Sequence, residues 1–216
     1  MSEVIVDTLK HTGNSGTANL TLASNGNVTV ANDLTVTDTL TVPTKKLVCP
    51  GTIIQVQNTT YTAQASVSLS SASTWYNISQ INVAITPTAA SSKFLINVLT
   101  TGETNYAPHD FSFKLVRTVG GSGTDIAIGD ADGNNTRCTG VLPPGYHGDD
   151  NDTTGGMFTI PNYLDSPNTT SEVTYGLYIL CHAASKTLFL NGVVNQGDHA
   201  AHECTPSWMT VMEVAG

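Results

Sequence analysis

The sequence predicts an all-β protein, with a short-strand N-terminal segment in residues 1–48 followed by a jelly-roll β-sandwich in residues 49–216. Threonine is the commonest residue and valine and isoleucine are frequent, which favours strands. Glycine and asparagine recur every ten or so positions, a spacing typical of turns between short strands. No window of a dozen residues keeps an apolar stripe at helical spacing, so we expect very little helix.

The N-terminal segment contains a repeated pattern of polar, aliphatic, threonine, aliphatic. The four copies are residues 19–22, 27–30, 33–36 and 39–42. Strands this short expose an aliphatic row that a single chain cannot bury, whereas three copies wound around one axis would bury it. The pattern therefore predicts a trimeric shaft or attachment segment, and an ordinary meander or a threonine-rich linker stays open as the alternative.

The strands lengthen after a boundary around residues 43–51. Ile81, Val83 and Ile85 share one face and alternate with Asn82, Ala84 and Thr86, which predicts a half-buried strand over 78–85. Residues 93–99 and 175–181 are apolar on both faces, as in the middle of a sandwich or at an oligomer axis. Further strands are expected over residues 111–115, 125–128, 157–160, 188–190 and 208–212. Eight or more strands with loops rich in Gly, Pro and Asn predict the jelly roll.

Charge excludes several classes of function. Residues 1–119 are neutral overall, and residues 120–216 carry the whole net charge of −9. The chain has only 8 basic residues, so we expect no nucleic-acid binding. No apolar run reaches the roughly 18 residues of a membrane span, and the first residues lack the features of a signal peptide. We therefore expect that the chain does not insert into a membrane. We also expect that it is made in a cytoplasm.

Four cysteines are spread along the chain, at positions 49, 138, 181 and 204. Their spacing excludes a zinc ribbon and a thioredoxin motif. Without a secretory signal, buried free thiols are the expected state, and two disulfides remain the alternative.

Five segments of the second region carry a recognisable pattern: residues 92–96, 113–117, 128–131, 163–170 and 209–214. With them, residues 52–216 resemble the C-terminal domain of virion structural proteins from tailed phages, especially marine or cyanophage-like ones. Residues 5–11 followed by 19–22 are similar to the opening of such proteins. The resemblance implies a tail-fibre or head-fibre protein whose distal head is a homotrimeric jelly roll of the tumour-necrosis-factor and complement-head type. In that arrangement, residues 175–181 would be the strand at the axis.

One stretch and several loop side chains suggest a receptor-binding surface. Residues 136–157 contain more acidic residues and histidine than the family pattern leads one to expect. Aromatic and histidine side chains in exposure-prone loops can supply binding energy, which avidity in a trimer would multiply. The residues predicted to bind a receptor are Tyr106, His109, Tyr146 and His147.

Metal binding and catalysis have weaker support in the sequence. A loose Ca²⁺ site could use Asp130, Asp132, Asp149, Asp150 and Asp152, although an EF-hand is excluded because Val141 stands where the twelfth-position Glu should be. No cofactor is otherwise expected, and His199 and His202 lack a defined fourth partner for zinc. Hydrolase and phosphate-binding motifs are missing, so we expect no enzyme.

The sequence therefore predicts a non-enzymatic virion protein. Its main interpretation is a tail fibre whose trimeric head binds a host surface glycan or protein, with residues 1–48 contacting other virion proteins. The first alternative is a capsid or head-decoration fibre anchored by residues 1–48. The second is a fibre tip that cleaves polysaccharide with a pair of carboxylates.

Overall fold

The computed structural model describes residues 8–9, 20–22, 28–30, 49–105, 111–141, 154–200 and 202–216. The chain divides into two compact units, Met1–Lys46 and Leu47–Gly216. Each unit is described by itself.

The first unit contains a small antiparallel sheet. Its strands are β1 (Thr8–Leu9), β2 (Leu20–Leu22) and β3 (Val28–Val30), in the order β1-β2-β3. Strands β2 and β3 coincide with the first two copies of the predicted repeat. The copies at 33–36 and 39–42 lie outside the described residues.

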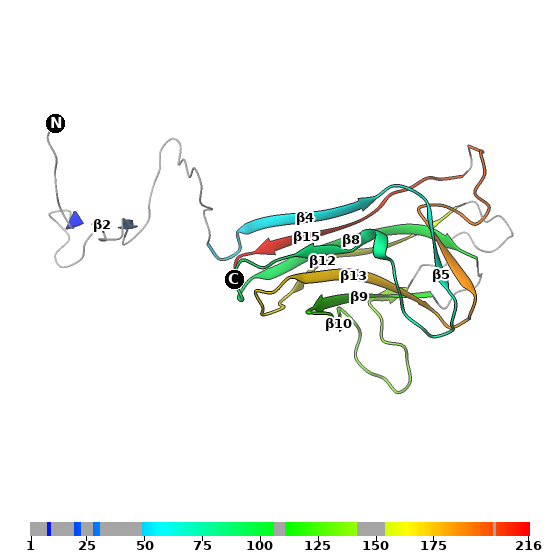
Figure 1. Cartoon of the computed structure of the whole chain (residues 1–216), viewed down its shortest axis with the longest axis horizontal. Coiled ribbons are helices and arrows are strands. Elements are labelled where there is room, and N and C mark those ends of the chain that lie inside the picture. The colour runs from blue at the N-terminus through cyan, green and yellow to red at the C-terminus, as the bar shows by residue number, and fades with distance from the viewer. Residues whose placement is uncertain are drawn as a thin grey trace. The chain divides into compact units, whose positions relative to one another are not determined.

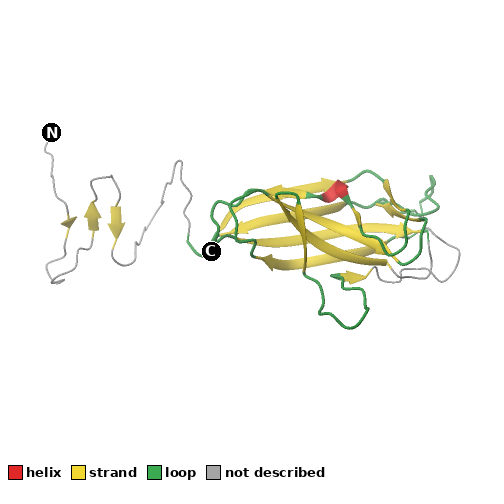
Figure 2. Ribbon diagram, turned by 60° about the horizontal axis from the view of Figure 1, so that its bottom comes forward, coloured by secondary structure: helices red, strands yellow, loops and turns green. Residues whose placement is uncertain are grey.

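The second unit is a sandwich of two antiparallel sheets, so the predicted all-β class is confirmed (Figures 1 and 2). Strand β15 pairs with β4 and β8, and β12 pairs with the other side of β8. In the opposite sheet β13 pairs with β9 and β7, and β9 also pairs with β10. These two four-stranded arrangements, β4-β15-β8-β12 and β7-β13-β9-β10, give the connections of a jelly roll.

The strand bounds follow from the alternation of apolar residues and from the turns that end each run. The first sheet holds β4 (Ile53–Tyr61), β5 (Ala65–Leu69), β8 (Lys93–Thr104), β12 (Gly156–Asp165), β14 (Lys186–Leu190) and β15 (Ser207–Val214). The second holds β6 (Tyr76–Asn77), β7 (Val83–Ile85), β9 (Phe111–Val119), β10 (Ser122–Ile126), β11 (Gly140–Val141) and β13 (Val173–Cys181).

The core lies between the two sheets and consists of aliphatic and aromatic side chains. Phe94 of β8 packs against Tyr175 of β13, with ring centroids 5.9 Å apart. Phe113 of β9 stacks on Phe158 of β12 at 4.5 Å. Because both pairs join one sheet to the other, they fix how the two layers face each other.

Two predicted strands differ from the structure. The strand expected over 78–85 is reduced to β7, because Ser79–Ile81 form a short 3-10 helix, η1. This turn buries Ile78 and Ile81, three residues apart, as effectively as an extended strand would bury alternate residues. The strand expected over 125–128 is β10, which ends at Ile126 because Ala127 adopts a φ of 55°.

The predicted axis strand has its partners within one chain. Tyr175, Leu177 and Ile179 are fully buried between the two sheets. Burial in the core of one chain therefore accounts for the inward residues of this run, whereas Leu180 lies on the other face of β13. The position of residues 175–181 relative to an oligomer axis stays a prediction.

The chain enters the sandwich at one of its two ends (Figure 1). We call the end at which residues 49–52 lead into β4 the proximal end, and the opposite end the distal end. At the proximal end, the amide of Gly51 donates to the carbonyl of Ala215, and the amide of Ala215 donates to Thr52, at 2.9 and 2.8 Å. At the distal end, β4 finishes at Tyr61 opposite Ser207, where β15 begins. The chain thus joins the jelly roll at the proximal end.

Candidate functional site

The distal end is where the strands flanking the predicted receptor-binding residues terminate. Strand β8 runs from Lys93, opposite Val214, to Thr104 at the distal end. Strands β9 and β12 start there, and Gly156 of β12 lies opposite Gly102. The segments 106–110 and 142–153 are therefore attached to distal strand ends.

The predicted receptor-binding residues themselves, Tyr106, His109, Tyr146 and His147, lie outside the described residues. The same holds for Asp149, Asp150 and Asp152 of the predicted calcium loop. Asp130 and Asp132 are described and exposed, and the Asp132 carboxylate accepts a 3.1 Å hydrogen bond from Asn135. No group of three or more metal-ligating side chains gathers within the part of the chain that the structure describes.

A rigid polar network lies beneath the distal end, centred on Asn191. This residue is fully buried with a φ of 60°, and its side-chain amide donates to the carbonyls of Tyr61 and Ala63 at 2.7 and 2.9 Å. Its Oδ1 accepts from the Ser207 hydroxyl at 2.6 Å and from Thr101 at 3.3 Å. The network ties β4, β8 and β15 together where β4 ends and β15 begins.

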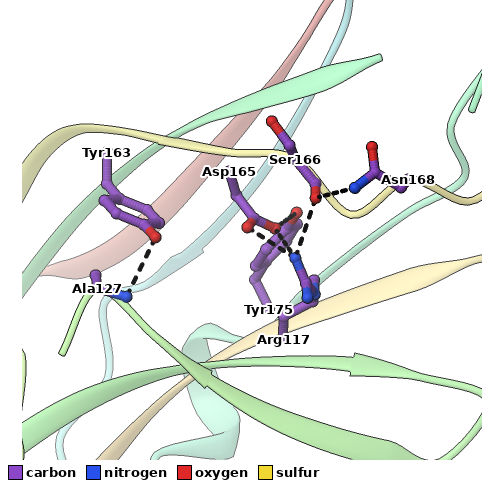
Figure 3. Close-up of polar contacts among 7 residues, drawn as sticks. All are labelled: Arg117, Ala127, Tyr163, Asp165, Ser166, Asn168 and Tyr175. Carbon is purple, nitrogen blue, oxygen red and sulfur yellow. Dashed lines mark hydrogen bonds and ion pairs between the residues drawn. The ribbon is translucent and has the colours of Figure 1, made fainter. Parts of the chain in front are cut away.

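A buried ion pair connects the two sheets near the end of β12 (Figure 3). Arg117 of β9 reaches both oxygens of Asp165 with its Nη1, at 2.8 and 3.1 Å. The Tyr175 hydroxyl donates to Asp165 Oδ2 at 2.8 Å. Burial, and then the neighbouring Asp165 charge, raises the pKa of Tyr175 above the ordinary tyrosine value, so the hydroxyl stays protonated as a donor.

A second buried carboxylate, Glu213 of β15, accepts hydrogen bonds at the proximal end. Its Oε1 accepts from the backbone amide and hydroxyl of Thr88 and from the Ser92 hydroxyl, at 2.7, 2.6 and 2.6 Å. Gln55 donates to Oε2 at 2.6 Å. Burial alone would raise the pKa of Glu213, but the hydrogen bonds from Ser92, Thr88 and Gln55 outweigh it and lower the pKa below the ordinary glutamate value.

These buried carboxylates stabilise the fold, because their oxygens are used by neighbouring donors. A third, Glu103, accepts from the backbone amide of Val194 at 2.7 Å and is also buried. A glycosidase acid or nucleophile has to reach the sugar, which Asp165 and Glu213 do not do in their buried positions.

Three described histidines lie close to hydroxyl groups or to one another. His182 lies between the hydroxyls of Ser73 and Thr136, each at 3.0 Å from a ring nitrogen. His199 and His202 are close, with ring centroids 5.7 Å apart.

All four thiols are free. Only Cys181 is buried, whereas Cys49 and Cys204 are exposed. The expectation of burial is therefore wrong for these two, because both lie in loops rather than strands.

The most distinctive surface among the described residues is the outer sheet face, formed by the outward-pointing side chains of β4, β15, β8 and β12. Of the five large apolar residues exposed in the described part of the chain, four belong to strands of this sheet, at 48 to 57% exposure: Ile53, Val56, Met157 and Leu164. The fifth, Val141, belongs to the other sheet. The sequence signal for this face was the run 93–99, apolar on both sides, although the run alone could not show which partners would share its outer side.

The described residues include no helix with the length and apolar character that crossing a membrane requires.

No protein-family model and no curated protein matches the chain. Solved structures show only low similarity to the chain, as three of them illustrate. The infectious bursal disease virus VP2 subviral particle is 12% identical, with a TM-score of 0.34, and the match covers 83% of this chain and 42% of that one.

The structures of the Gx and Gt strains of the same virus are 11% and 12% identical, with TM-scores of 0.31 and 0.30. These matches cover 88% and 89% of this chain but only 47% and 44% of the viral chains, so this chain spans less than half of their length. Membership of a family does not follow from similarity at this level, and the resemblance to phage virion proteins stays a prediction.

Proposed function

We propose that the protein is a non-enzymatic structural component of a phage virion, a homotrimeric tail fibre whose jelly-roll head binds a host surface glycan or protein. The observation that carries this proposal is the polarity of the head. The chain joins it at the proximal end, between Gly51 and Ala215. The strands flanking the segments that contain the predicted receptor-binding residues end at the opposite, distal end.

This arrangement suits a molecule that is attached at one end and makes contact at the other. The Asn191 network ties the distal ends of β4, β8 and β15 together, and a binding site built on such strand ends would lose less conformational entropy when it binds. Three heads on one axis would add avidity to a weak contact.

Binding to host cells tests the receptor role. We expect the full chain to bind cells of a host strain, and the double substitution Tyr106→Ala with Tyr146→Ala to weaken that binding tenfold or more. Ser91→Ala, an exposed position near the proximal end, should leave binding unchanged. Equal binding by the double variant would contradict a distal receptor site.

Position on the particle separates a tail fibre from the alternative of a capsid fibre. Cross-linking intact particles through Lys10 or Lys45 identifies the neighbouring protein, and a tail protein is expected. A capsid neighbour would instead support a head-decoration protein. Release of oligosaccharide from host polysaccharide by the purified protein would contradict the non-enzymatic proposal.

A further inference from the structure

We propose that Asn191 is a deamidation site that folding protects, and that its conversion in the unfolded chain prevents the jelly roll from forming again. The inference goes beyond the proposed function, because it concerns how long the fold persists and not what the protein binds. It rests on the sequence around Asn191 and on the hydrogen bonds that hold its side chain.

Asn191 is followed directly by Gly192, one of two Asn-Gly pairs in the chain; the other is Asn25 with Gly26. In such a pair the backbone nitrogen of the glycine attacks the side-chain carbon Cγ of the asparagine. A new C–N bond forms, the bond from Cγ to the NH2 group breaks, and that group leaves as ammonia with the proton of the glycine amide. Water then opens the resulting succinimide to aspartate or isoaspartate. Glycine favours the reaction because it has no side chain to hinder the approach.

The folded structure fixes the Asn191 side chain. It is fully buried, and its amide nitrogen donates both hydrogens, to the carbonyls of Tyr61 and Ala63 at 2.7 and 2.9 Å. Its oxygen accepts from Ser207 and Thr101 at 2.6 and 3.3 Å. An amide offers two hydrogens and two lone pairs, so all four are used. Because ring closure expels the amide nitrogen, it would remove both donor bonds and leave the two carbonyls without this donor.

The backbone of the pair is held as well. The amide of Asn191 donates to the carbonyl of Thr101 at 2.9 Å, and the amide of Gly192 donates to the carbonyl of Phe189 at 3.4 Å. The nitrogen of Gly192 has to lose its proton during the attack, and both residues of the pair are buried away from water. Reaction in the native protein therefore requires the structure to open, and its rate follows the small population of open chains.

The products do not fit the same place. The carboxylate of an aspartate would put an oxygen where the amide has two hydrogens, so it would face the carbonyl oxygens of Tyr61 and Ala63 with no hydrogen between them. None of the four hydrogen-bond partners of the Asn191 side chain is positively charged, so the buried charge would also lack compensation. Isoaspartate instead lengthens the main chain by one methylene at a residue whose φ is 60°.

The position of Asn191 extends the damage to the first sheet of the sandwich. Asn191 follows β14 directly, Tyr61 ends β4, Thr101 belongs to β8 and Ser207 begins β15. One side chain thus connects strands that lie far apart in the sequence and that a refolding chain has to bring together. A chain changed at residue 191 lacks a contact that these strands share, and we expect it not to regain the native fold.

Mass spectrometry of the full-length protein tests the protection. Native protein and protein unfolded in guanidinium chloride are incubated in the same mildly alkaline buffer. Deamidation is followed in the tryptic peptides 11–45 and 187–216, each of which contains one Asn-Gly pair. We expect Asn191 and Asn25 to convert at similar rates in the unfolded chain, and Asn191 to convert at least about 100-fold more slowly in the native protein. A smaller difference, or an unfolded chain in which Asn25 converts and Asn191 does not, would overturn the assignment.

Refolding after dilution of the denaturant tests the consequence. The fraction of chains that regain a cooperative thermal transition should fall in step with the fraction of intact Asn191. Gly192→Ala should slow both losses at least about tenfold, because its methyl group hinders the attack. The atoms nearest to the added Cβ would belong to the exposed side chains of Gln64 and Gln196, at 3.1 Å, and these can move aside, so the variant should fold.

Gly26→Ala is the matched control, which should slow deamidation at Asn25 and leave the loss of refolding unchanged. Refolding that survives full conversion of Asn191, or that is lost as fast in Gly192→Ala as in the wild type, would overturn the consequence. If Gly192→Ala gives no cooperative transition before the incubation, Asn191→Asp replaces it as a copy of one product. That variant should lack the native transition, and a transition like that of the wild type would contradict the proposal.

Discussion

Asp165 and Glu213 are buried carboxylates that lie on either side of Phe94 in the same sheet, and each accepts hydrogen bonds from a different kind of donor. Asp165 has a guanidinium and a phenol, whereas Glu213 has hydroxyl, amide and backbone donors. This difference leads to different expectations for substitution and for pH.

Replacing Asp165 by asparagine should destabilise the fold strongly. The substitution leaves the Arg117 guanidinium, whose side chain is only 20% exposed, without its counter-charge. We expect a loss of about 3 kcal/mol in the free energy of unfolding, measured by denaturant titration. Asp125→Asn is the control, because the Lys114–Asp125 pair involves a carboxylate that is 41% exposed and should contribute less than about 1 kcal/mol. Equal losses in the two variants would contradict the role of burial.

Glu213 should make the fold sensitive to acid. Its pKa is lowered in the native state, so the unfolded chain takes up the proton at a higher pH than the native chain does. The stabilisation is therefore present above the ordinary glutamate pKa of about 4.3 and is lost as the pH falls through the lower native value. Glu213→Gln should be less stable at pH 7 and should lose less stability on acidification, as measured by thermal unfolding across pH. Parallel acid profiles for the two proteins would exclude this role for Glu213.

The buried polar residues could not be identified from the sequence. Asp165 pairs with Arg117 across 48 positions of the chain. Glu213 is 125 positions from Thr88. Only the strand register brings such groups together, and register is set by the packing of the whole sandwich rather than by local pattern.

At the scale of elements, the local sequence pattern predicted burial best where apolar and other side chains alternate along a strand. The buried side chains Ile81, Val83 and Ile85 were predicted correctly, although the backbone around Ile78 and Ile81 is helical. The pattern identified which residues face the core. It did not predict the backbone conformation between them, where the amide of Ile78 donates a hydrogen bond to the carbonyl of Leu177 in β13.

Strand β8 approaches its antiparallel neighbour β14 closely at Gly102, which gives a prediction at this scale. A Cβ atom added to Gly102 would lie 2.3 Å from the carbonyl oxygen of Phe189, and the φ of Gly102 is +151°. Gly102→Ala should therefore separate β8 from β14 and cost at least about 3 kcal/mol of unfolding free energy.

Gly129→Ala provides the comparison, because a Cβ atom at Gly129 meets nothing within 4 Å. It should change stability by less than about 0.5 kcal/mol. A Gly102→Ala variant as stable as Gly129→Ala would show that the two strands can separate without cost.

At the scale of the molecule, the fold class was predictable because composition and turn spacing reflect many residues at once. The outer sheet face was not predictable in the same way. Leu164 and Val56 come from strands 108 positions apart in the chain, and their common row exists only because β15 and β8 lie between them.

The jelly roll should fold without the first unit. The described core residues all lie in Leu47–Gly216, from Val67 to Ala215. Deleting residues 1–48 should therefore leave a single cooperative transition in differential scanning calorimetry. Loss of that transition would mean that the second unit depends on the first for its stability.

The pairing of β4 with β15 also has a mechanical consequence. Residues 49–52 lead directly into β4, which is paired along its length with β15 from Ile53 opposite Val214 to Tyr61 opposite Ser207. A force that pulls on residue 49 while the distal loops are held would drag β4 lengthwise along β15. In this shearing geometry the ladder hydrogen bonds carry the load together, whereas peeling would break them one after another. The jelly roll is thus oriented to withstand tension between residue 49 and its distal end.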